Sequence, residues 1–204
     1  MHTETDQQQP PSLGNAGGII LASQSPRRKQ LLQWAEVPFE IRVKETDESY
    51  PAGLTPAEVA IHIARNKALA ILQELDTTQP ILAADTIVVL GESLIGKPSN
   101  RDEAIAILNS LSGQIHHVIT GVVILYQGKE IAFADDTEVA FHPLTQQQVI
   151  FYVDKYQPYD KAGAYAIQEW IGVVGIKKVT GDFYNVMGLP VSRVVQALQR
   201  EGLL

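Results

Sequence analysis

Hydrophobic residues along the chain form two patterns that alternate with each other. Apolar runs, some broken by single polar residues, predict β-strands, and they lie at residues 19–22, 39–43, 80–90, 118–126 and 130–141. Apolar residues three or four positions apart predict helices that bury one face, and these helices begin near Ser25, Thr55, Asn100, Thr145 and Pro190. Because strands and helices interleave, the pattern indicates an α/β fold.

Turn signals predict a mixed sheet rather than a wholly parallel one. Gln127-Gly128-Lys129 joins two long predicted strands, which is typical of an antiparallel hairpin. A second hairpin is predicted around Thr180-Gly181-Asp182. We find no internal repeat and no charged linker, so residues 19–204 are expected to form a single domain. Residues 1–18 are polar and rich in Gln, Gly and Pro, and we expect a disordered or loosely held leader.

Composition narrows the classes of ligand. The 204 residues include no cysteine, which excludes disulfides, thiolate metal sites and cysteine nucleophiles. The chain has 16 Lys and Arg against 23 Asp and Glu, a net charge of −7, which argues against a nucleic-acid polymer as partner. The apolar runs are too short to cross a membrane and no secretory signal is present, so we expect a soluble cytoplasmic protein without a membrane partner. Any polyanionic ligand requires a local basic cluster.

Such a cluster follows the first predicted strand. Ser23, Ser25, Arg27 and Arg28 lie where that strand passes into a helix. A helix N-terminus presents free backbone N–H groups, and arginine presents a fork of donors, so the cluster suits a phosphate. The alternative is a capped surface helix with solvated arginines. We favour the phosphate interpretation for the cluster as a whole.

An aspartate interrupts the most hydrophobic predicted strand. Asp85 stands among Ile, Leu, Val and Ala, and a carboxylate buried there needs a partner because bare burial is costly. It is a candidate general base or metal ligand, and the alternative is a turn residue between two strands. An acidic run follows the second predicted strand and contains Glu45, Asp47 and Glu48. We expect most of this run to be solvated, with one member as a candidate second ligand for magnesium or manganese.

Other polar residues are weak signals individually. Lys67 in a helix of small residues and Lys97 after a glycine are each compatible with a solvated lysine. Lys161 and Gln168 flank a segment rich in Gly and Ala, where ion-binding and base-reading groups are available. The pair His116-His117 lies in a strand without a second ligand at a metal-binding spacing.

Several of these motifs occur together in a fixed order. They are Leu21-Ala22-Ser23-Gln24-Ser25-Pro26-Arg27-Arg28, Ala64-Arg65-Asn66-Lys67-Ala68, Ala84-Asp85-Thr86, Gly96-Lys97-Pro98, Leu111-Ser112-Gly113, Asp160-Lys161-Ala162-Gly163-Ala164-Tyr165 and Gly188-Leu189-Pro190. In this order the sequence resembles the Maf family of nucleoside triphosphate pyrophosphatases, over residues 19–198.

The resemblance implies a fold like that of the inosine-triphosphate pyrophosphatases, with a mixed sheet and a cleft between two lobes. It implies cleavage of a nucleoside triphosphate to the monophosphate and pyrophosphate with a divalent metal, Mg²⁺ or Mn²⁺. Asp85 would be the proton acceptor and, with Glu45, a metal ligand. The implied phosphate ligands are Ser23, Ser25, Arg28, Lys67, Lys97 and Lys161.

The resemblance also implies a substrate and an assembly. In the branch of the family that acts on dTTP and UTP, three positions accompany substrate choice, and here they are Arg27, Thr86 and Gln168. The implied assembly is a homodimer. Three alternatives stay open: the same hydrolysis on CTP or 7-methyl-GTP, release of orthophosphate, and a non-catalytic nucleotide-binding regulator of cell division.

Overall fold

A mixed β-sheet forms the centre of the molecule. The computed structural model describes residues 18–75 and 77–204, so the expected leader lies outside the described residues except for Gly18. The sheet has seven strands, in the order β2-β1-β3-β5-β6-β7 with β4 beside β3. Their bounds are β1 Ile19–Leu21, β2 Phe39–Ile41, β3 Ile81–Leu90, β4 Ser93–Ile95, β5 Ile115–Tyr126, β6 Lys129–Phe141 and β7 Ile176–Thr180.

The sheet changes from parallel to antiparallel at β3. Strand β1 is parallel to both β2 and β3, whereas β3, β5, β6 and β7 are successively antiparallel. The predicted mixed α/β sheet is therefore confirmed, including the hairpin between β5 and β6. On its other edge, β3 pairs with β1 through Leu82 and with β4 from Val88. Between these residues, within the described chain, that edge of β3 has no strand partner.

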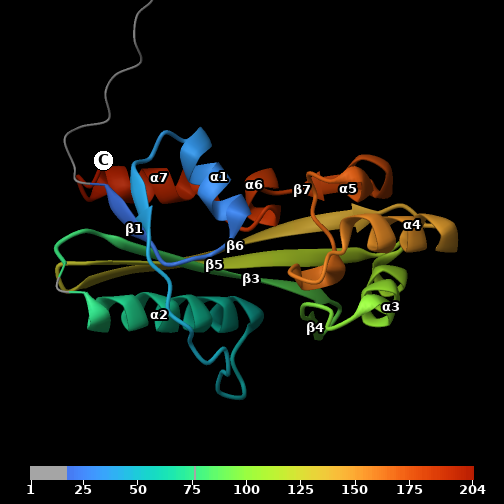
Figure 1. The fold of residues 1–204 in the computed structure, drawn as a ribbon, viewed down its shortest axis with the longest axis horizontal. Helices are drawn as coiled ribbons and strands as arrows, with labels where there is room; N and C mark the ends of the chain where they lie inside the picture. Colours follow the sequence, from blue (N-terminus) through green and yellow to red (C-terminus); the bar gives the residue numbers. More distant parts are fainter. Residues whose placement is uncertain (1–17, 76) are drawn as a thin grey trace, which may run out of the picture.

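Helices cover both faces of the sheet (Figure 1). Helix α2 (Pro56–Glu74) lies along one face, and α1 (Pro26–Trp34), α6 (Phe183–Val186) and α7 (Val191–Arg200) lie on the other. Helices α3 (Arg101–Leu111), α4 (Gln146–Tyr156) and α5 (Trp170–Gly175) gather toward one end, near the short 3-10 helix η1 (Ala162–Ala164). No helix in the described ranges is both long and apolar enough to cross a membrane.

The helix starts follow from local capping. Thr55 and Thr145 each form a reciprocal capping box with the residue three positions on. The side chains of Ser25 and Asn100 accept backbone N–H bonds in the first turns of α1 and α3. Each of these four residues is a predicted helix start, and the hydrogen bonds confirm them.

Helix α2 approaches the sheet unusually closely at Gly121 of β5. A Cβ at this position would lie 2.3 Å from the backbone of Ala60. Ala64 and Ala68 of α2 are fully buried against the same face. Small residues on both surfaces therefore seat the helix on the sheet and bring its polar residue Lys67 within reach of β3.

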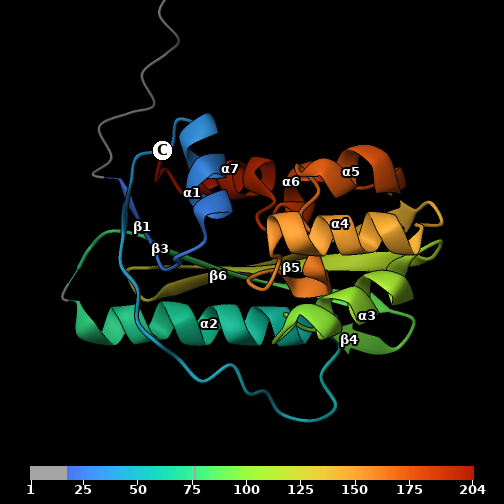
Figure 2. The same cartoon turned by 45° about the vertical axis from the view of Figure 1, so that its right-hand side comes forward.

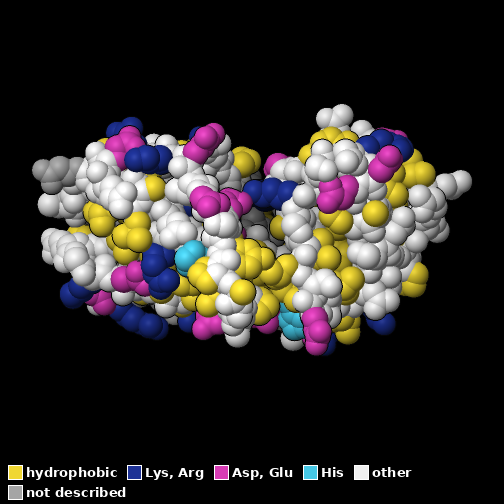
Figure 3. All heavy atoms as spheres, turned by 90° about the horizontal axis from the view of Figure 1, so that it is seen from below, with side chains coloured by type: hydrophobic (Ala, Val, Ile, Leu, Met, Phe, Trp, Pro, Cys, Tyr) yellow, Lys and Arg dark blue, Asp and Glu magenta, His cyan; other side chains and the backbone are white. Residues whose placement is uncertain are grey.

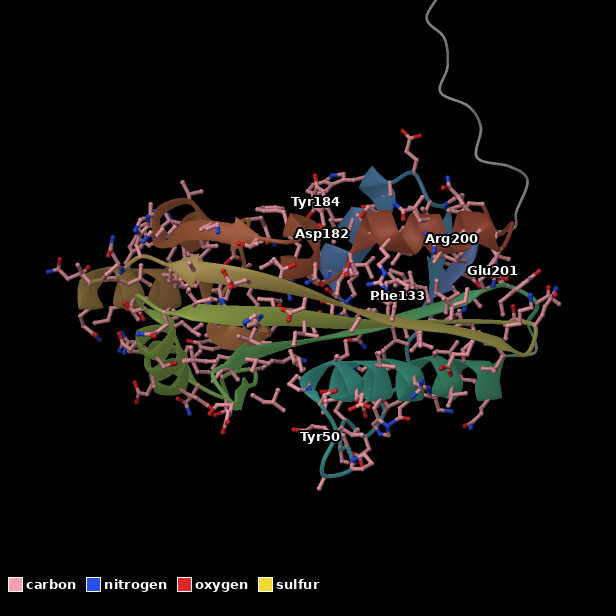
Figure 4. The ribbon with its side chains drawn as sticks, turned by 180° about the vertical axis from the view of Figure 1, so that it is seen from behind. Tyr50, Phe133, Asp182, Tyr184, Arg200 and Glu201 are labelled. Atoms are coloured by element: carbon pink, nitrogen blue, oxygen red, sulfur yellow. The ribbon has the colours of Figure 1, made fainter. Side chains whose placement is uncertain are left out.

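The predicted hairpin at Thr180-Gly181-Asp182 is wrong. Strand β7 ends at Thr180, and the Asp182 side chain accepts a hydrogen bond from the Tyr184 backbone N–H at 2.7 Å, which starts α6. Figure 4 shows Asp182 and Tyr184 together at this helix, on the face of the sheet that carries α7, with Phe133 of β6 between the sheet and α7. A turn and a helix cap use the same residue types, and here the cap forms.

Candidate active site

A cleft of about 600 Å³ opens beside the unpaired edge of β3. Most of its lining comes from five segments: the passage from β1 into α1, the residues after β2, the middle of β3, and the stretches at residues 160–166 and 186–188. Figure 3 shows a hollow between two halves of the molecule, with acidic and basic side chains at its edge. The predicted cleft between two lobes is thus present, and it lies where β1 has turned away from β3.

The cleft has the opposite charge to the molecule as a whole. Its lining holds six basic and four acidic side chains, a formal +2, in a chain of net charge −7. The basic side chains are Arg27, Arg28, Lys44, Lys67, Lys97 and Lys161, and the acidic ones are Glu45, Glu48, Asp85 and Asp160. Such a local reversal attracts a small anionic ligand while the rest of the surface repels a polyanion.

Asp85 faces the layer of α2. Its Oδ1 accepts a hydrogen bond from Lys67 Nζ at 2.7 Å, and the same Nζ lies 2.7 Å from Glu48 Oε1. The Asp85 side chain is 13% exposed, and the strand continues unbroken through it, so the alternative of a turn aspartate is wrong. The hydrogen bond from Lys67 lowers the pKa of Glu48 against the opposing effect of burial. Two carboxylates therefore share one ammonium group at the floor of the cleft.

Glu48 reaches α2 from the long segment between β2 and α2. In Figure 2 this segment passes the sheet edge and runs beside α2, where Tyr50 also lies (Figure 4). Glu45 lines the same cleft, but within the described residues it makes no ion pair. The carboxylate that meets the Asp85–Lys67 pair is therefore Glu48 rather than Glu45.

Thr86 points to the opposite layer, because neighbouring residues of a strand alternate between faces. Its Oγ1 accepts a hydrogen bond from Arg28 Nη2 at 3.0 Å and lies 2.9 Å from Thr120 Oγ1. Arg28 also donates from Nε to the Gly188 carbonyl at 2.8 Å and from Nη1 to Ser23 Oγ at 3.1 Å. Burial lowers the pKa of Arg28, and the nearby charge of Asp85 partly opposes this. Arg28 thus ties α1 to β3 while lining the cleft.

A second charged group borders the cleft on the side of η1. Asp160 accepts from Lys161 Nζ at 2.7 Å and from Arg27 Nη1 at 3.3 Å. Lys161 is nearly buried, and its Nζ lies 3.7 Å from Glu169 Oε1. The two basic residues therefore share the Asp160 carboxylate.

Most sequence-predicted site residues meet in this cleft. Those that line it are Ser23, Ser25, Arg27, Arg28, Glu45, Lys67, Asp85, Thr86, Lys97 and Lys161. Gln168 is exposed and lies outside the lining. Sequence reasoning placed Glu48 in the acidic run but assigned the metal to Glu45, and it did not select Glu169. The signal that points to both residues is the need of largely buried lysines for opposite charges.

The donor set suits a metal whose ligands come partly from a substrate. No group of three or more His, Asp and Glu side chains able to hold a metal occurs in residues 18–75 and 77–204. Mg²⁺ commonly takes one or two carboxylates and completes its shell with phosphate oxygens and water. Asp85 and Glu48 fit that arrangement, because both carboxylates already contact one positive group, the ammonium of Lys67.

Comparison with known proteins agrees with the motifs. The family described as "Maf-like protein" matches residues 18–201. A protein of Cytophaga hutchinsonii named dTTP/UTP pyrophosphatase is 49% identical over 182 residues, 89% of this chain and 83% of that protein. Proteins with the same name from Parabacteroides distasonis and Bacteroides thetaiotaomicron are 46% and 44% identical, over 89% of this chain and 94% and 95% of theirs.

A solved structure titled nucleoside-triphosphatase / dITP/XTP pyrophosphatase, from Mycobacterium abscessus, shares 13% identity. It covers 60% of this chain and 72% of its own, with a TM-score of 0.37.

The family match extends over nearly all of the described residues, from the strand that precedes the Ser23–Arg28 cluster to the final helix. The chain belongs to the Maf family.

Proposed function

We propose that this protein hydrolyses dTTP and UTP to the nucleoside monophosphate and pyrophosphate. The observation that carries the proposal is the Asp85 carboxylate, held ionically by Lys67 at the unpaired edge of β3 within a net positive cleft. The name shared by the relatives supplies the substrates. A non-catalytic binding protein needs the basic groups, but it does not need a proton acceptor beside the bond that is cleaved.

The reaction is attack of water on the α-phosphorus with pyrophosphate as the leaving group. Such a transfer depends on positioning and on neutralising charge more than on covalent chemistry. Asp85 accepts the proton of the attacking water. Arg27, Lys97 and Lys161 neutralise the phosphates, while Arg28 holds Ser23 and the Gly188 backbone in place.

Asp85 and Glu48 would hold a divalent cation, Mg²⁺ or Mn²⁺, with Glu45 close by in the lining. When bound, this cation polarises the phosphate and acidifies the water. Lys67 contacts both carboxylates through its ammonium group. As the substrate enters, Lys67 gives up one of these two contacts and binds a phosphate oxygen instead. Base selection by Arg27, Thr86 and Gln168, a homodimer and a cytoplasmic location stay predictions.

Asp85→Asn tests the proposal. The change keeps the shape of the side chain but removes the proton acceptor, so kcat for dTTP should fall by roughly 10²–10⁴-fold while the nucleotide still binds. Asp136→Asn is the matched control, because Asp136 lies on β6 and pairs with His117 away from the cleft. Undiminished turnover in Asp85→Asn would remove Asp85 from the mechanism.

The products separate the alternatives. Purified protein is incubated with dTTP, UTP, CTP and 7-methyl-GTP, with Mg²⁺, Mn²⁺ or a chelator, in ¹⁸O-labelled water. Attack at the α-phosphorus puts the label in the monophosphate, and it should be found with dTTP and UTP. Labelled orthophosphate would indicate a phosphatase, a preference for another nucleotide would correct the substrate, and no product at all would favour the non-catalytic regulator.

A further inference from the structure

The charged group around Lys161 contains two carboxylates in different situations. Asp160 is 58% exposed and is shared between Lys161 and Arg27. Glu169 is 23% exposed and faces Lys161 alone among the basic groups described. The Lys161 side chain itself is 10% exposed. A nearly buried ammonium group needs a lasting counter-charge, and Glu169 is the better shielded of the two carboxylates.

Tyr152 holds Glu169. This tyrosine of α4 is fully buried, and its hydroxyl donates to Glu169 Oε2. The same hydroxyl accepts the backbone N–H of Ala166, a residue that lines the cleft, at 3.1 Å. Burial raises the pKa of Tyr152, so the hydroxyl keeps its proton and stays a donor. One side chain therefore fixes both the carboxylate and the backbone beside it.

The distances assign different tasks to the two carboxylates. Asp160 forms a hydrogen bond with Lys161 Nζ at 2.7 Å, whereas Glu169 lies at 3.7 Å, near enough to balance the charge but too far to use a donor. An incoming polyphosphate competes with Asp160 for Arg27 and Lys161, and the exposed Asp160 can yield. Glu169 then remains as the counter-charge and leaves the three N–H donors of Lys161 to the phosphate.

We propose that Glu169 and Tyr152 are positioning residues that hold Lys161 toward the phosphates of the substrate. The proposal rests on the proposed function, since it takes Lys161 as a ligand of the triphosphate. It predicts that loss of Glu169 weakens substrate binding through Lys161 and leaves the chemical step at Asp85 intact.

A double-mutant cycle with Glu169→Gln and Lys161→Met tests this inference. For Glu169→Gln the KM for dTTP should rise by about 10-fold, the effect of one charge-assisted contact, with kcat within about 2-fold of wild type. Lys161→Met should raise KM at least as much. Adding Glu169→Gln to Lys161→Met should change little, because the contact that Glu169 supports is already gone. Additive effects, or an unchanged KM in Glu169→Gln, would overturn the proposal.

Controls separate this outcome from others. Asp154→Asn is matched, because Asp154 also lies on α4 but pairs with Arg101 away from the cleft, and both kinetic constants should keep their values. Tyr152→Phe removes the donor and keeps the ring, and KM should rise while kcat holds. If Tyr152→Phe fails to fold, the cycle at positions 161 and 169 decides alone. Absence of hydrolysis by the wild-type protein would refute the proposed function instead.

Discussion

Adding a single methyl group at Gly121 tests how the helix layer positions the site. In Gly121→Ala the new Cβ would lie 2.3 Å from the Ala60 carbonyl carbon and from the Ile61 nitrogen. Contacts between carbon atoms normally lie at roughly 3.5–4.0 Å, so α2 has to retreat by more than about 1 Å. Both colliding atoms belong to the backbone, and no change of side-chain rotamer relieves the clash.

The magnitude follows from two opposing effects. Overpacking in a well-packed interior costs about 1–3 kcal/mol, and a clash with backbone belongs at the upper end of that range. Alanine in place of glycine restores about 0.5–1 kcal/mol, because glycine in a strand loses more conformational freedom on folding. We therefore expect the free energy of unfolding to fall by about 2 kcal/mol.

Equilibrium unfolding in urea measures this loss of stability, and the kcat for steady-state hydrolysis of dTTP reports whether the active site keeps its geometry. As α2 retreats, Lys67 shifts relative to Asp85 on β3, so kcat should fall together with stability. Gly96→Ala is the stability control, because a Cβ at Gly96 would meet nothing within 4 Å and its backbone is not left-handed. A Gly121→Ala protein as stable as wild type would refute the view that close approach of α2 requires a glycine.

Two further changes probe buried polar groups. Arg28→Lys should lower the free energy of unfolding by about 1–3 kcal/mol and raise KM, because one ammonium group cannot reach the three acceptors of Arg28. Urea unfolding measures the loss of stability, with Arg42→Lys at an exposed position as the control. Equal losses of stability in the two variants would contradict the prediction. Burial lowers the pKa of His116 from 6.5 to about 4, so its stabilising contribution is complete above pH 6.5 and is lost toward pH 4. Between pH 7 and pH 5 the free energy of unfolding of the wild type should therefore fall by about 2 kcal/mol more than that of His116→Gln, measured by urea unfolding at each pH. The same pH dependence in both proteins would contradict this prediction.

The sequence predicts local features of this fold well. Thr55 and Thr145 start their helices as expected, because a capping box uses neighbouring residues. Asp85 is identifiable because a carboxylate in an apolar strand needs a partner, and that partner is Lys67. Both inferences depend on interactions whose cost can be judged from a short stretch of chain.

Long-range features are less accessible. The choice of Glu48 over Glu45 depends on how the segment after β2 runs beside α2. The residues of this segment show no hydrophobic period from which its path could be predicted. Strand order depends on pairing between distant residues, which periodicity does not encode. Gln168, selected through the family resemblance, is exposed outside the cleft, and its role in base selection stays a prediction.

The unpaired edge of β3 gives the two halves of the site different mechanical properties. Asp85 and Thr86 belong to a strand that is paired with β5 from Ile81 to Val89, so their backbone is held by the sheet. Glu48, Asp160 and Lys161 lie on connecting segments outside the sheet, where no neighbouring strand holds the backbone. In the proposed reaction, the residues outside the sheet can therefore adjust to the phosphates while the backbone of Asp85 stays in place.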